Sequence, residues 1–102
     1  MNAHELRGPG GTITITPAAL TQVVVGAAEL VDGARVRKPR RGLDLELADG
    51  RAQVSLELVA SVGAVLPDLA RAVQEQVRHA LEGMCDVTVE RVDVSVEELE
   101  DR

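Results

Sequence analysis

The side-chain types needed for nucleophilic catalysis meet in one stretch of this sequence, where His79, Cys85 and Asp86 lie close together. A nucleophile needs a base within hydrogen-bond reach and a third group that orients the base. Helical spacing predicts that His79 projects from the polar face of a helix, whereas Cys85 follows Met84 at the exit of that helix. A free cysteine usually packs as a small hydrophobic residue. We therefore predict no catalytic site and no enzyme activity.

Metal and cofactor chemistry has no stronger signal in the sequence. His4, His79 and Cys85 lack ligand spacings such as C-x-x-C or H-x-x-x-H. The run 8–11, GPGG, matches the G-x-x-G of a phosphate-clamping loop, but that loop lies between two helices and this run precedes a predicted strand. The acidic residues of the predicted strands fall at the alternating positions of a solvated sheet face: Asp44, Glu46, Glu57, Glu90 and Asp93. We predict no cofactor and no metal site.

Composition excludes further classes of protein. The 102 residues include no Phe, Tyr or Trp and carry a net charge of −6. Base stacking and aromatic cages need rings, and a negative net charge disfavours nucleic acid and anionic lipid. One cysteine cannot form an internal disulfide, no apolar run approaches the roughly 20 residues of a membrane span, and residues 1–11 lack the apolar core of a signal peptide. We expect a cytoplasmic protein without direct membrane insertion.

Hydrophobic periodicity predicts four strands and two helices. Their order predicts a two-layer α+β sandwich, β-α-β-β-α-β, with both helices packed on one face of a small mixed or antiparallel sheet. The valine phase changes between Val89 and Val92, which predicts either a β-bulge near Glu90 and Arg91 or pairing that begins after them. The predicted strands cover 12–15, 43–47, 53–62 and 87–96, and the helices cover 17–31 and 66–84. The resulting domain, 12–97, is expected between a flexible tail at 1–11 and an acidic tail at 98–102.

The first predicted helix is apolar on nearly all sides. Val25, Gly26 and Leu30 extend its apolar surface beyond the stripe that faces the sheet. A helix of this kind is usually buried on more than one side. We interpret these three residues as a candidate subunit contact in a homo-oligomer. The alternative is that this face lies under the hairpin loop or the second helix.

One basic cluster contrasts with the acidic composition of the chain: Arg35, Arg37, Lys38, Arg40 and Arg41. It is a candidate contact for lipid headgroups or for an acidic patch on a partner. It is also compatible with a solvated loop, or with a contact to a neighbouring chain's acidic C-terminal segment: Glu97, Glu98, Glu100 and Asp101. The alternative function is a small nucleic-acid-binding module that uses residues 35–41 against phosphate, although the composition makes nucleic acid an unfavourable partner.

Several stretches carry a family resemblance. These are GTITITPAAL at 11–20, VSLELV at 54–59, and LPDLARAVQEQVRHALEGM at 66–84 followed by V-x-V-x-x-V-D-V-x-V. Together they resemble the alkaline shock protein family of Gram-positive bacteria, also called the Gls24-like or envelope stress response family. The resemblance implies a non-enzymatic cytoplasmic protein that self-associates and is held near the membrane by a separate small membrane-anchor protein. The preference for Arg over Lys further suggests a GC-rich, actinobacterial source.

Overall fold

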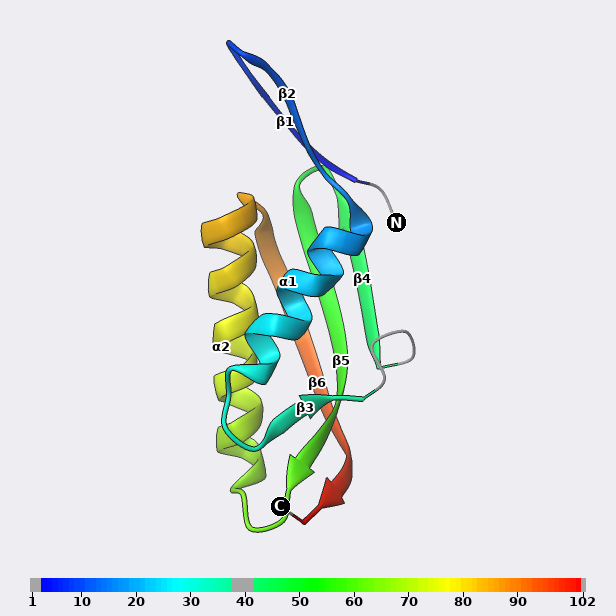
Figure 1. Cartoon of the computed structure of the whole chain (residues 1–102), viewed down its shortest axis with the longest axis vertical. Coiled ribbons are helices and arrows are strands. Elements are labelled where there is room, and N and C mark those ends of the chain that lie inside the picture. Colours follow the sequence, from blue (N-terminus) through cyan, green and yellow to red (C-terminus); the bar gives the residue numbers. More distant parts are fainter. Residues whose placement is uncertain (1–2, 38–41, 102) are drawn as a thin grey trace.

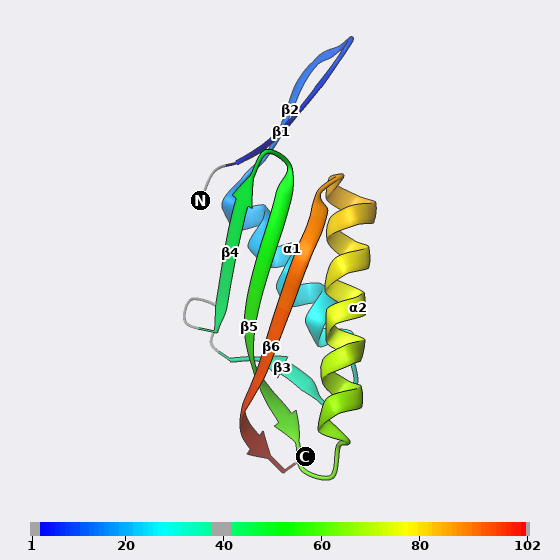
Figure 2. The same cartoon turned by 180° about the vertical axis from the view of Figure 1, so that it is seen from behind.

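A computed structural model describes residues 3–37 and 42–101 (Figure 1). Helices α1 and α2 lie together on one face of a sheet, and a separate two-stranded hairpin projects beyond the end of this body (Figures 1 and 2). The predicted α+β sandwich with both helices on one face is confirmed. The elements are β1 (His4–Gly8), β2 (Gly11–Ile15), α1 (Pro17–Glu29), β3 (Ala34–Val36), β4 (Leu43–Ala48), β5 (Arg51–Ser61), α2 (Leu66–Cys85) and β6 (Thr88–Glu100). Strands β1 and β3 are additions to the predicted order.

Strand β5 organises the sheet. β6 pairs with it in parallel over residues 51–61, after a crossover through α2. β4 and β3 pair with it antiparallel, β4 opposite 51–56 and β3 opposite 58–60. Because β6 occupies one edge of β5, β3 and β4 share the other edge end to end. The break between them lies opposite Glu57.

Two local predictions about backbone geometry are confirmed. Asp49 and Gly50 both have positive φ, 53° and 72°, as a type I′ turn between β4 and β5 requires. In β6, Val89 lies opposite Ala52 and Arg91 lies opposite the next residue of β5, so Glu90 is the extra residue of a bulge. The bulge allows valines of both phases to face the helices.

The core lies between the helices and the inner face of the sheet. Helix α1 begins after Thr16, whose Oγ1 accepts a hydrogen bond from the Ala19 N–H at 3.2 Å, and it ends at Glu29, two residues before the predicted end. The most deeply buried large side chains come from both layers: Leu20, Val24, Val54, Leu58, Val73, Val77 and Leu81. Branched aliphatic side chains therefore fill the space that aromatic rings occupy in most domains of this size.

Both predicted tails differ from the structure. Residues 4–8 form β1, because the cross-strand pairs His4–Ile15 and Leu6–Ile13 place apolar side chains on one face of a hairpin. At the other end, β6 continues to Glu100, with Leu99 opposite Ala60. The glycine content of 1–11 and the acidic charge of 98–102 predict loose chain, whereas residues 4–8 and 98–100 each pair with a neighbouring strand.

Candidate functional site

The residues considered for catalysis do not converge. His79 is 75% exposed on α2, where its Nε2 lies 3.5 Å from Glu75 Oε2. Cys85 is buried at the end of the same helix, and burial raises the pKa of its thiol. Within residues 3–37 and 42–101, no group of three or more His, Cys, Asp or Glu side chains is placed to hold a metal ion. The remaining candidates for a functional site are therefore the charged and the apolar parts of the described surface.

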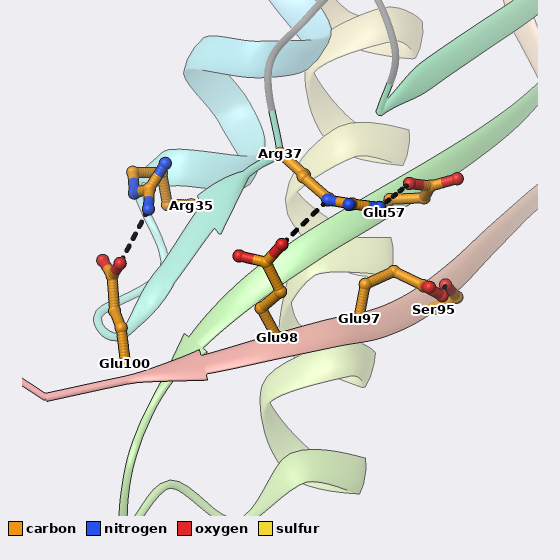
Figure 3. Close-up of polar contacts among 7 residues, drawn as sticks. All are labelled: Arg35, Arg37, Glu57, Ser95, Glu97, Glu98 and Glu100. Carbon is orange, nitrogen blue, oxygen red and sulfur yellow. Dashed lines mark hydrogen bonds and ion pairs between the residues drawn. The ribbon is translucent and has the colours of Figure 1, made fainter.

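The described part of the basic cluster is paired with carboxylates of the same chain (Figure 3). Arg35 Nη2 lies 2.8 Å from Glu100 Oε2. Arg37 Nη1 lies 3.0 Å from Glu57 Oε1, and its Nε lies 3.2 Å from Glu98 Oε1. Hydrogen bonds and charge from these carboxylates raise the pKa of both arginines. We call these five residues the Arg–Glu cluster.

The Arg–Glu cluster joins three strands that are far apart in the sequence. The arginines belong to β3 and the residue after it, Glu57 to β5, and the other two carboxylates to the end of β6. The sequence left open whether Glu98 and Glu100 of a neighbouring chain meet the basic cluster, and the structure pairs them within one chain. Lys38, Arg40 and Arg41 lie outside the described residues.

The backbones of Arg37 and Gly42 meet at the same residue of β5, and we call this junction the neck. The Arg37 N–H donates to the Glu57 carbonyl oxygen at 2.9 Å, and the Glu57 N–H donates to the Gly42 carbonyl oxygen at 2.7 Å. Residues 37 and 42 are therefore held against the same residue of β5. The chain between them starts and ends at one point, beside the Arg–Glu cluster.

An apolar groove of 650 Å³ runs between α1 and α2. Its described lining is Ala19, Gln22, Val23, Gly26, Ala27, Leu30, Gln76, His79, Ala80 and Met84. Leu30 and Met84 are 75% and 72% exposed, so the groove presents two large apolar side chains to solvent. We call this surface the α1–α2 groove.

The α1–α2 groove contains part of the predicted subunit contact. Gly26 and Leu30 line it, whereas Val25 packs half-buried against the core. The sequence patterns identify no contact on the α2 side of the groove, where Ala80 and Met84 lie. The sequence signal that could have identified it is a large apolar residue, Met84, in the last turn of the helix.

No helix in the described part of the chain is both long and apolar enough to cross a membrane.

Fold and surface together define a small two-layer α+β domain with an ion-paired sheet edge and an apolar helix groove. A family model matches residues 34–100, more than half of the chain. The protein belongs to the alkaline shock protein (ASP23) family, which is described as having a cell envelope-related function. The family resemblance seen in the sequence is confirmed at this level.

Solved structures that resemble the chain include several forms of MamM-CTD. A doubly substituted form has a TM-score of 0.58 and 24% identity, covering 81% of this chain and 94% of that one. A cadmium form has a TM-score of 0.54 and 23% identity, covering 83% and 95%. At these identities the likeness concerns the fold alone. No curated protein sequence matches the chain.

Proposed function

We propose that this chain is a non-enzymatic interaction protein of the cell envelope, which self-associates and docks onto a small membrane-anchored partner protein. Membership of a family with a cell envelope-related function, over residues 34–100, is the observation that carries the proposal. In this role the protein acts in the cytoplasm, at the inner face of the membrane through its partner. The α1–α2 groove, which includes Gly26 and Leu30, supports the self-association, with Val25 beside it.

The basic cluster is the proposed contact for the partner. Its described members, Arg35 in β3 and Arg37 after it, lie beside the neck formed by Arg37 and Gly42. Glu57, Glu98 and Glu100 neutralise the two described arginines, so a phosphate backbone would have to compete with three carboxylates. This competition argues against the nucleic-acid alternative, and the acidic side chains of a partner protein would also have to displace these carboxylates.

Capture of the partner tests this proposal. Tagged protein is recovered from gently solubilised cells at two salt concentrations, and the eluate is examined by protein mass spectrometry and nucleic-acid staining. We expect a small membrane protein at both salts, and its loss from the triple variant Arg37→Glu, Arg40→Glu, Arg41→Glu. Arg71→Glu with Arg78→Glu and Arg91→Glu is the control, since it changes the charge equally on the surface between α2 and β6. Nucleic acid at low salt, without a membrane protein, would contradict the proposal.

A further inference from the structure

The hairpin of β1 and β2, residues 4–15, is amphipathic and is called the arm below. Its register places the pairs His4–Ile15 and Leu6–Ile13 on one face. The other face carries the polar pairs Glu5–Thr14 and Arg7–Thr12. The arm therefore has one apolar face, which packing against another apolar surface would stabilise.

This face is covered at the base of the arm and exposed farther out, with Leu6 and Ile15 half-buried. At the base of the arm, His4 is buried and its Nε2 lies 3.2 Å from the Asp86 carbonyl oxygen. Farther out, Ile13 is 62% exposed, and Figures 1 and 2 show the arm extending beyond the helices and the sheet. A two-stranded hairpin is at best marginally stable in water without a surface to pack against. The arm is thus anchored at its base, and Ile13 is the large apolar side chain that its outer part leaves exposed.

The α1–α2 groove matches the arm in length. A strand of five residues such as β1 extends about 17 Å. Along α1, the groove runs from Ala19 to Leu30, which spans about 16 Å at the helical rise. Both surfaces are apolar, and each belongs to every copy of the chain.

The arm and the α1–α2 groove also carry little charge. The whole chain carries a net charge of −6, so most approaches of two copies meet like-charge repulsion. In the arm, Glu5 and Arg7 cancel each other. The described residues that line the groove contain no carboxylate, and His79 is their one titratable side chain. These surfaces allow two copies to meet without that repulsion.

We propose that the apolar face of the arm of one copy packs into the α1–α2 groove of a second copy. This inference rests on the self-association in the proposed function and assigns its interface. The arm extends away from the helices of its own chain, so the groove that it reaches belongs to another molecule (Figure 1). When copies add head to tail the contact is heterologous, and an open assembly keeps a free arm at one end and a free groove at the other. The arm and α1 also lie outside the family-matched residues 34–100.

Disulfide trapping between two different variants tests the contact. Ile13→Cys and Gly26→Cys are made separately in a Cys85→Ala background, which removes the native thiol. We expect a rapid disulfide dimer when the two are mixed, and slow trapping when Ile13→Cys is mixed with Arg71→Cys on the other side of α2. Equally rapid trapping of Ile13→Cys with itself would show arm-to-arm pairing and overturn the proposal.

Filling the groove gives a second test that leaves the fold intact. A Cβ at Gly26 meets no atom within 4 Å, so larger side chains fit there in the isolated chain. We expect Gly26→Gln to weaken self-association about tenfold or more in light scattering, and Gly26→Ala to leave it nearly unchanged. A wild-type chain that stays monomeric at all concentrations would contradict both the proposed self-association and this interface. Association that persists in Gly26→Gln, without trapping between positions 13 and 26, would remove the interface alone.

Discussion

Gly42 lies so close to Arg37 that a Cβ atom on it would stand 1.9 Å from the Arg37 carbonyl oxygen. Both residues bind the backbone of Glu57, one through its N–H and the other through its carbonyl oxygen. A side chain at position 42 is incompatible with this arrangement. The glycine at position 42 therefore allows the two backbone segments to approach each other at the neck between β3 and β4.

The first prediction concerns the stability of this neck. Gly42→Ala forces two backbone segments apart, and we expect it to lower the free energy of unfolding by about 1–3 kcal/mol, as overpacking typically does. Urea denaturation measures the change. Gly10→Ala is the control, because a Cβ there meets no atom within 4 Å, and its effect should stay within about 0.5 kcal/mol. Equal stability of the two variants would contradict the close approach at the neck.

The second prediction concerns the carboxylates of the Arg–Glu cluster. Glu98→Gln with Glu100→Gln removes partners of Arg37 and Arg35. We expect this variant to elute from a heparin column at a higher salt concentration than the wild type, because its guanidinium groups are free to bind sulfate. Asp44→Asn with Glu46→Gln makes the same change of net charge on exposed positions of β4. If both variants elute alike, net charge explains the shift and the carboxylates do not mask the arginines.

Local sequence signals predict the body of this fold well, because each depends on neighbours within a few residues. The alternation in β4 and β5, the Asp49–Gly50 turn and the phase change around Glu90 all depend on such short-range rules. The ordered ends are different. Pairing of Leu99 with Ala60 depends on which strand is adjacent, whereas pairing of Leu6 with Ile13 belongs to a local hairpin that the glycine-rich composition hides.

The candidate surfaces also include one feature that local sequence predicts and one that depends on the order of the strands. The apolar excess of α1 indicated a contact face, and Gly26 and Leu30 do line a groove. The partners of Arg35 and Arg37 depend on the sheet order, since Glu100 is 65 residues from Arg35. The sequence shows which side chains are charged, but the order of the strands, which the crossover through α2 sets, determines which of them form ion pairs.

The third prediction concerns the start of α1. Thr16 caps the helix by accepting the Ala19 N–H, and Ala cannot replace this hydrogen bond. We expect Thr16→Ala to lower the free energy of unfolding by about 1 kcal/mol. Thr14→Ala, at an exposed position of β2, should have a smaller effect in the same urea titration. A reversed order of the two would show that the cap contributes little.

The fourth prediction concerns Cys85, whose side chain is buried with 3% exposure. Burial raises the pKa of its thiol above the ordinary value, because the thiolate would lose its hydration. In the unfolded chain the pKa returns to about 8.5. As the pH rises through that value, the unfolded state loses its proton before the folded state does. The contribution of this thiol to stability is therefore complete below the unfolded pKa and is lost as the pH rises towards the folded pKa.

Comparison with Cys85→Ala isolates this contribution. We expect the free energy of unfolding of the wild type to fall more steeply between pH 7 and pH 10 than that of the variant, because both share every other titrating group. A thiol reagent should also modify the native wild type slowly at pH 8 and rapidly once urea unfolds it, because the reactive form is the thiolate. Rapid modification of the native protein, or parallel pH profiles for the two chains, would place Cys85 in contact with solvent and contradict its burial at the end of α2.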